Sequence, residues 1–170
     1  TDQVAAIETR DVAALASNQL NKLSTDQIAA LTTAQAGALT SAETAALTSD
    51  QVAALSSSQL DALKNLTALT TRQIQALTTD QVATLNTADV AALLTRQIAA
   101  LTSDQALALG TDQIVALGSA QLQALATATL AQLSTDSIAA IETRDIPFLK
   151  TSQLAGLTTD QIVALTTAQL

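Results

Sequence analysis

Cysteine, histidine, methionine, tryptophan and tyrosine are all absent from this 170-residue sequence, and its one aromatic residue is Phe148. Without cysteine, disulfide bonds and thiolate chemistry are excluded. General acid–base and nucleophilic catalysis usually draws on His, Cys, Tyr or a carboxylate perturbed in a pocket. We therefore predict that the chain is not an enzyme and that it has no catalytic, cofactor-binding or metal site.

Basic side chains are also scarce. Seven Lys and Arg residues stand against 15 Asp and Glu residues, which gives a formal net charge of −8. Such a chain is not attracted to nucleic acid or to an anionic membrane. No apolar run approaches the roughly 20 residues that a membrane helix needs, so we expect neither a nucleic-acid partner nor membrane insertion.

What the sequence does contain is a leucine that returns every eight residues. Numbering each octad so that this residue is position 8 gives the consensus T-[T/S]-x-Q-[I/V/L]-x-A-L, of which 24–31 is a clean example. A fixed short period of this kind indicates a repeat architecture. The position-8 residues are Leu or Ile at 7, 15, 23, 31, 39, 47, 55, 63, 69, 77, 85, 93, 101, 109, 117, 125, 133, 141, 149, 157 and 165.

The apolar positions 5 and 8 are three residues apart, which places them on one face of a helix rather than of a strand. One continuous α-helix is nevertheless excluded, because eight residues at about 100° each overshoot two turns by roughly 80° and leave no apolar stripe. We therefore predict one short helix per octad, over roughly positions 3 to 8, followed by a sharp bend.

The recurring Ser and Thr residues are the expected helix caps. Position 2 is the more uniform, and we favour it as the cap. The alternative is position 1, which forms the capping-box pattern S/T-x-x-Q with position 4, as in Thr32 with Gln35. Under the first hypothesis, Asn86, Gly110 and Gly118 at position 1 suit a left-handed residue that closes the preceding helix.

A longer period of 24 residues is visible in the Asp residues at position 3. Helices this short are unstable alone and must stack, so three octads per coil predict an all-α solenoid with its Leu, Ile and Val side chains toward the axis. About seven coils at about 8–10 Å each predict a rod on the order of 60–70 Å long. The three Asp series are Asp2, Asp26, Asp50; Asp80, Asp104; and Asp112, Asp136, Asp160.

We predict a single repeat domain over 1–170, with irregularities at 64–69, 102–109 and 142–150. The unit 64–69 lacks two residues, and we expect a bend or bulge there. At 102–109 one octad interrupts the Asp series. Pro147 and Phe148 replace small residues, and Phe148 predicts a locally widened core.

Three polar columns have competing explanations. Asp at position 3 suits either calcium ligands or, as we favour, helix N-termini. Gln at position 4, from Gln3 onward, is either a recognition strip or, as we favour, a hydrogen-bonded structural ladder. Regular Thr pairs resemble the arrays of ice-binding proteins, although those arrays usually lie on strands. The position-3 arginines are expected to pair with acidic residues on adjacent coils; they are Arg10, Arg72, Arg96 and Arg144.

The phrase L-T-T-D-Q-V-A-T-L (77–85) resembles the opening of the DNA-reading repeats of bacterial TAL effectors. The period here is far shorter and the chain is acidic, so we interpret this similarity as shared helix-start chemistry. Nearly the whole chain resembles the L-T-T-x-Q-[I/V]-x-A-L tandem octapeptides of very large, repetitive bacterial surface or secreted proteins. That resemblance implies a structural or spacer role and an extracellular or cell-surface location.

We therefore expect a non-catalytic structural rod, spacer or filament-forming segment. The chain starts and stops within an octad, so we expect it to be a segment of, or a stacking unit in, a longer array. Its partners would be further repeats of the same polypeptide, or other copies stacked head to tail. The alternative is a solenoid binding module for a protein, a glycan or an ice surface, which a non-repeating exposed face such as 142–150 would favour.

Overall fold

The computed structural model describes residue 4 and residues 6–169, and within this part of the chain every regular element is a helix. Asp2 and Gln3, which belong to two of the predicted columns, lie outside the described residues. The chain divides into two compact units, residues 1–85 and 86–170. The single repeat domain predicted over 1–170 stays a prediction.

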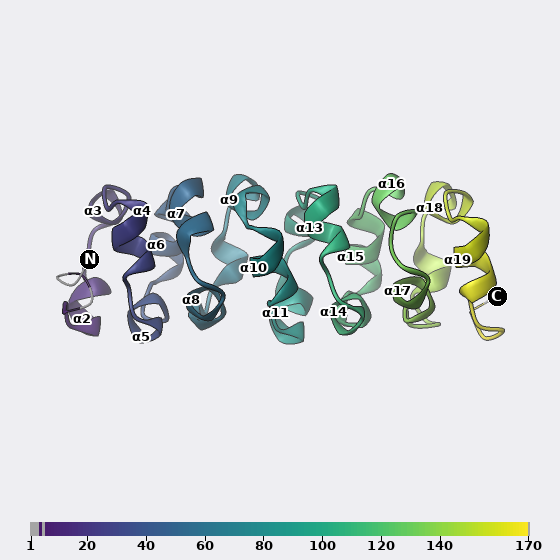
Figure 1. Cartoon of the computed structure of the whole chain (residues 1–170), viewed down its shortest axis with the longest axis horizontal. Coiled ribbons are helices and arrows are strands. Elements are labelled where there is room, and N and C mark those ends of the chain that lie inside the picture. The colour runs from purple at the N-terminus through teal and green to yellow at the C-terminus, as the bar shows by residue number, and fades with distance from the viewer. Residues whose placement is uncertain (1–3, 5, 170) are drawn as a thin grey trace. The chain divides into compact units, whose positions relative to one another are not determined.

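The first unit contains nine described α-helices and one 3-10 helix (Figure 1). In chain order these are α2 (Thr9–Val12), α3 (Ser17–Leu20), α4 (Thr25–Ala29), α5 (Thr33–Ala36), α6 (Ser41–Ala46), α7 (Ser49–Ala54), α8 (Ser57–Ala62), η1 (Leu66–Ala68), α9 (Thr71–Ala76) and α10 (Thr79–Ala83).

The second unit repeats this plan with nine further α-helices and a second 3-10 helix. They are α11 (Thr87–Ala92), α12 (Thr95–Ile98), α13 (Ser103–Leu107), α14 (Thr111–Ala116), α15 (Ser119–Ala124), α16 (Thr127–Leu130), α17 (Thr135–Ala139), η2 (Ile146–Phe148), α18 (Thr151–Ala155) and α19 (Thr159–Ala164). The prediction of one short helix per octad is thus confirmed.

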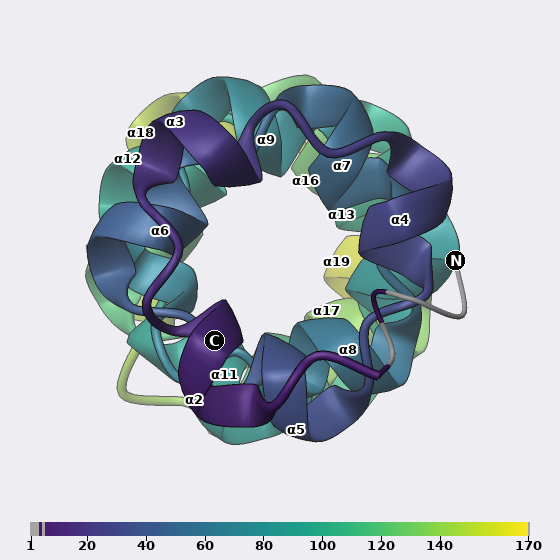
Figure 2. The ribbon, with the colours of Figure 1, turned by 90° about the vertical axis from the view of Figure 1, so that its left-hand side faces the viewer.

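Within each unit, every helix packs on the helix three octads further along the chain. In the first unit α2 packs on α5, α3 on α6 and α4 on α7, and in the second α11 packs on α14 and α12 on α15. Figure 2 shows α2 to α7 following one another around a ring, clockwise as the chain recedes from the viewer, so this unit is a right-handed solenoid. The predicted coil of about three octads is confirmed.

The solenoid core is built from positions 5 and 8, as the sequence predicts. In the octad 24–31, Ile28 and Leu31 are buried while the residues at positions 1, 2 and 3 are exposed. The same two positions supply nearly the whole buried apolar set, in which Leu, Ile and Val predominate. Aliphatic burial between layers therefore stabilises helices too short to persist alone.

Position 1, rather than the favoured position 2, is the helix cap. Thr48 accepts a hydrogen bond from the Gln51 amide at 3.2 Å, and Gln51 Oε1 accepts one from the Thr48 amide at 2.8 Å, which completes a capping box. Ser24, Thr32 and Thr78 cap their helices in the same way. The prediction was wrong by one residue, and the helices begin at position 2 instead of position 3.

The bends between helices consist of two extended residues, positions 8 and 1. Leu55 has φ −64° and ψ 138°, and Ser56 has φ −68° and ψ 158°. Gly110 and Gly118 adopt the same extended conformation, and none of the described residues has a positive φ. The prediction of left-handed residues at Asn86, Gly110 and Gly118 was therefore wrong; Asn86 is instead a helix cap.

The shortened unit 64–69 replaces an α-helix with the 3-10 helix η1. Its Leu66 and Leu69 are buried like any residues at positions 5 and 8, and η1 packs on α6, the helix three units earlier. A tighter helix needs fewer residues for a turn, so the shortened unit keeps its core residues and its packing partner although it lacks two residues. Asn65, before η1, has φ −136° and ψ 48°, which is neither helical nor extended, and the bend or bulge that we expected here stays a prediction. The octad 102–109 also fits the packing rule, because α13 packs on α16.

Phe148 does not widen the core. It lies in η2 with 57% of its surface exposed, and Pro147 is exposed beside it, while Ile146 and Leu149 fill the core positions. The prediction was wrong because positions 5 and 8 fill the core, and at positions 6 and 7 of this octad the side chains of Pro147 and Phe148 are exposed to solvent.

Candidate functional site

The glutamines at position 4 are the most regular polar feature, and each has two separate tasks. Besides its capping bond to Thr48, Gln51 donates from Nε2 to the carbonyl oxygens of Leu20 at 3.0 Å and Leu23 at 2.7 Å. These acceptors lie 31 and 28 residues earlier, at positions 5 and 8 of the octad four before. One amide thus ties a helix N-terminus to the bend beneath it in the neighbouring coil.

This pattern recurs throughout both units. In the first unit Gln35, Gln59, Gln73 and Gln81 donate in the same way, and in the second Gln121, Gln153, Gln161 and Gln169 do so. All of these side chains are buried or nearly so. The favoured hypothesis of a structural ladder is confirmed, because a buried, fully bonded amide has no group left to recognise a ligand.

The glutamine hydrogen bonds also indicate the length of one coil. Each helix packs along the helix three octads earlier, but its glutamine bonds to the octad four earlier. A coil of the solenoid is therefore somewhat longer than three whole octads. Equivalent positions in neighbouring coils are displaced around the axis rather than stacked directly above one another.

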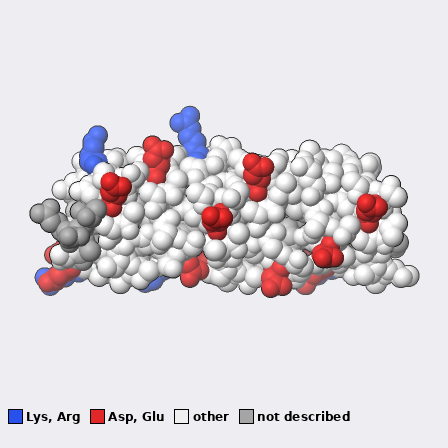
Figure 3. Space-filling view, viewed as in Figure 1, with Lys and Arg blue, Asp and Glu red and all other residues white. Residues whose placement is uncertain are grey.

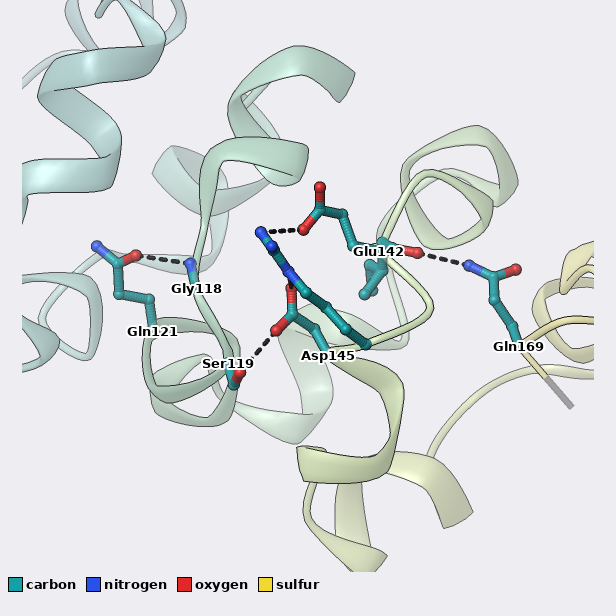
Figure 4. A network of polar contacts seen from close by, with 8 residues as sticks. Gly118, Ser119, Gln121, Glu142, Asp145 and Gln169 are labelled. Carbon is teal, nitrogen blue, oxygen red and sulfur yellow. Dashed lines mark hydrogen bonds and ion pairs between the residues drawn. The ribbon is translucent and has the colours of Figure 1, made fainter.

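Where position 4 carries a shorter side chain, a different bond can join the layers. Asp145 is buried and accepts a hydrogen bond from Ser119 Oγ, in a neighbouring layer, at 2.6 Å (Figure 4). Figure 4 also shows the capping bond of a glutamine, in which Gln121 accepts from the backbone amide of Gly118. Ser119 is a position-2 residue 26 positions earlier. Buried Thr129 and Ser103 form an equivalent pair at 3.4 Å. The hydroxyl at position 2 can thus bridge layers where glutamine is missing.

Glu43 is a further exception; it occupies position 4 in the first unit and is buried. Its Oε2 accepts from the Thr40 amide at 2.6 Å, so the capping half of the pattern is kept. A carboxylate without an N–H group cannot make the second half, the donation to the neighbouring coil.

The aspartates at position 3 lie in the first turns of their helices, as in Asp26, Asp50 and Asp80. This placement is the one that we favoured, since the helix dipole stabilises acidic side chains there. Figure 3 shows the acidic residues dispersed singly over one face. Among residues 4 and 6–169, no group of three or more His, Cys, Asp or Glu side chains could hold a metal ion.

The arginine pairs are local instead of joining adjacent coils. Arg10 Nε lies 2.9 Å from Glu8 and 3.3 Å from Asp11, and Arg144 pairs with Glu142. The expectation of inter-coil pairs was wrong for these two arginines, since their partners are at most two residues away. Such exposed pairs contribute little to stability.

A shallow hollow lies between α2, α5 and α8 in the first unit. Its lining includes Thr9, Thr33, Ala62 and Lys64. Gly37 allows this close approach, because a Cβ there would lie 3.0 Å from the Ala62 carbonyl oxygen. Two hydroxyls and one ammonium group among small side chains form no acid–base pair.

None of the helices in the described part of the chain is long and apolar enough to span a membrane.

Comparison with known proteins identifies the repeat. The sequence profile of the ALTTAQ repeat matches residues 4–41, 83–119 and 138–170, which together make up more than half of the chain. No curated protein matches the sequence of this chain. The matched segments contain the cap, glutamine and apolar positions described above, and the chain belongs to the ALTTAQ repeat family.

Proposed function

We propose that the chain is a non-catalytic structural spacer, a repeat segment whose number of coils sets a distance. The observation that carries this proposal is the glutamine ladder. The one polar residue type that the octad repeats at a buried position bonds to backbone amides and carbonyls, as Gln51 does with Thr48, Leu20 and Leu23. The hydrogen-bonding groups of this repeated residue therefore join neighbouring layers and do not contact a substrate.

The resemblance to repetitive bacterial surface and secreted proteins supports a place in such a protein, outside the cell or on its surface. Labelling intact cells with an antibody against an exposed helix would test this location. Signal from intact cells is expected, and signal from lysed cells alone would contradict it.

Insertion of three octads, slightly less than one coil, tests the spacer function. A second copy of residues 24–47 placed directly after Leu47 adds three octads with all their caps and core residues. Small-angle scattering should show a maximum dimension longer by about 8–10 Å, the distance between packed helices, with an unchanged cross-section. The matched control inserts 24 Gly and Ser residues, which form a flexible coil. An insertion that thickens the particle without lengthening it would refute the proposal.

A second function is favoured by one exposed feature. Phe148, with 57% of its surface exposed, and Pro147 interrupt an otherwise uniform repeat. This segment supports the alternative of a binding module for a protein, a glycan or ice. A glycan array and an ice-recrystallisation assay, each comparing the chain with Phe148→Ser, test the last two ligands. Binding that is lost in Phe148→Ser would favour this function, and equal signals would count against it.

A further inference from the structure

Three consecutive octads of the second unit lack the glutamine of position 4. At this position residues 126–149 contain Thr129, Ser137 and Asp145, and glutamine returns at Gln153. Because a coil is somewhat longer than three octads, these three octads make up nearly one whole layer of the solenoid. None of the three shorter side chains donates a hydrogen bond to a described carbonyl group of the preceding coil. We call residues 126–149 the glutamine-free layer.

The bends that face this layer lack the hydrogen bond that glutamine supplies elsewhere in the unit. The Leu93 carbonyl oxygen accepts from Gln121 at 2.7 Å, across the usual 28 residues. The same spacing from Thr129, Ser137 and Asp145 leads back to three further position-8 residues. They are Leu101, Leu109 and Leu117. Their carbonyl oxygens accept no hydrogen bond from any described residue, so the ladder is interrupted over nearly a full coil.

The contacts that replace the ladder here are fewer. A glutamine such as Gln161 donates twice to the preceding coil, at 3.0 and 2.8 Å, so three glutamines would supply two bonds each. The glutamine-free layer has instead one bond from Ser119 to Asp145 at 2.6 Å and one contact between Ser103 and Thr129 at 3.4 Å. The boundary between this layer and the coil before it is therefore held by fewer interlayer hydrogen bonds than a boundary with a complete ladder.

The helices of the glutamine-free layer are also short. α16 has four residues and α17 has five, and the third octad forms only the three-residue 3-10 helix η2. In η2, Pro147 supplies no backbone N–H group. Helices of this length have few internal hydrogen bonds and depend on packing against neighbouring layers. The weak boundary thus belongs to a layer that has little stability of its own.

We propose that the glutamine-free layer is a joint at which the second unit opens first, by separating from the coil before it. Its helices α16, α17 and η2 pack on α13, α14 and α15, and one glutamine, Gln153, still crosses this boundary at its edge. Residues 158–169 stay bonded to the layer through Gln161 and Gln169. This proposal rests on the spacer function, because a spacer held at both ends is loaded along its axis. The joint then yields before the coils that have a complete ladder.

Hydrogen exchange followed by mass spectrometry tests the joint on the unaltered chain. Opening exposes the amides of α16 and α17 but leaves α13 and α14 in place, so the two pairs of helices report on opposite sides of the boundary. Because the boundary has fewer interlayer bonds than one with a complete ladder, the amides of α16 and α17 should exchange about 100-fold faster, or more, than those of α13 and α14.

Restoring one donor distinguishes a weak boundary from short helices. Ser137→Gln places an amide where the ladder spacing leads to the carbonyl groups of Ala106 and Leu109. It should slow exchange in α16 and α17 by about 30-fold or more, the effect of two typical hydrogen bonds. Thr135→Gln is the matched control, because Thr135 is exposed in the same helix, and it should leave these rates unchanged. Far-ultraviolet circular dichroism establishes that each variant retains its helices.

Two results would overturn the joint: protection that falls evenly from α13 to α19 with no break between α14 and α16, or exchange in α16 and α17 that a folded Ser137→Gln variant leaves unchanged. Should Ser137→Gln not fold, Thr129→Gln provides the same test one octad earlier in the layer. If the three-octad insertion lengthens the particle while no break is found, the spacer function stands and the joint alone fails.

Discussion

Replacing Gln51 with methionine isolates the energetic weight of the glutamine ladder. Methionine keeps the length of the side chain but removes all three hydrogen bonds, one to the Thr48 amide and two to the carbonyls of Leu20 and Leu23. A typical hydrogen bond contributes about 1 kcal/mol net. The free energy of unfolding should therefore fall by about 3 kcal/mol.

Gln27 supplies a matched control in the same unit. Its Oε1 accepts from the Ser24 amide at 2.8 Å, the same distance as in the Gln51 cap, but its Nε2 donates to no described residue. Gln27→Met should then lower the free energy of unfolding by about 1 kcal/mol. The difference between the two variants, about 2 kcal/mol, measures the interlayer bonds alone.

Substitution with glutamate separates the two tasks of the side chain. Gln27→Glu retains its capping acceptor and should be nearly neutral. Gln51→Glu retains the cap but turns an oxygen toward two carbonyls in a buried place, and should destabilise at least as much as Gln51→Met.

Urea unfolding followed by far-ultraviolet circular dichroism measures all four variants, with equal slopes indicating that the same surface is exposed on unfolding. If Gln51→Met and Gln27→Met differed by less than about 0.5 kcal/mol, the interlayer bonds would not stabilise the stack. That result would refute the ladder as the element that joins coils.

Three further predictions concern caps, helix interiors and exposed positions. Thr78→Ala removes a helix cap and should lower the free energy of unfolding by about 1 kcal/mol. Thr79→Ala, at position 2, should change it by less than about 0.5 kcal/mol in the same urea assay. Ile114→Pro should lower the free energy of unfolding by about 3 kcal/mol or more, because it breaks the 3.0 Å hydrogen bond from the Ile114 amide to the Gly110 carbonyl and leaves a buried site unfilled. Thr111→Pro, at the first helical position, should have a far smaller effect. Thermal melts compare the two variants. Phe148→Ser should change stability by less than about 0.5 kcal/mol, and a larger loss would place Phe148 in the core after all.

Much of the fold was predictable because it depends on short-range periodicity. Positions 5 and 8 define a helical face, the eight-residue period excludes one long helix, and the Asp series pointed to three octads per coil. Each inference uses only the geometry of the helix and the need to bury aliphatic side chains. The helical solenoid follows from them.

The cap was not predictable from residue uniformity. Positions 1 and 2 both carry hydroxyl residues, as in Thr78 and Thr79, and composition alone does not decide which one is extended. In the structure position 1 is the extended residue, and a position-4 side chain such as Gln81 bonds back to the amide of Thr78 at 2.8 Å. The capping-box spacing S/T-x-x-Q contains this signal.

The interlayer half of the ladder lay beyond sequence reasoning for another reason. Bonds over 28 and 31 residues depend on the exact length of a coil, which exceeds three octads by an amount that no local pattern encodes. The outward direction of Phe148 has a related cause. Small residues at positions 6 and 7 suggested tight packing, and Gly37 and Gly156 are indeed closely packed. In the octad 142–149, however, both positions are exposed and accommodate Pro147 and Phe148.

The extended bends have a consequence for how such proteins diverge. Because positions 8 and 1 use backbone angles open to any residue, the bend imposes no glycine, and position 1 holds Ala16, Leu94, Gly118 and Lys150 without a change of conformation. The family profile passes over residues 42–82 and 120–137, yet within their own units α7 packs on α4 and α16 packs on α13 by the same three-octad rule. Sequence similarity between repeats can therefore become undetectable while the architecture is retained. The relationship between such repeats is better judged from the spacing of their buried positions than from the identity of the residues between them.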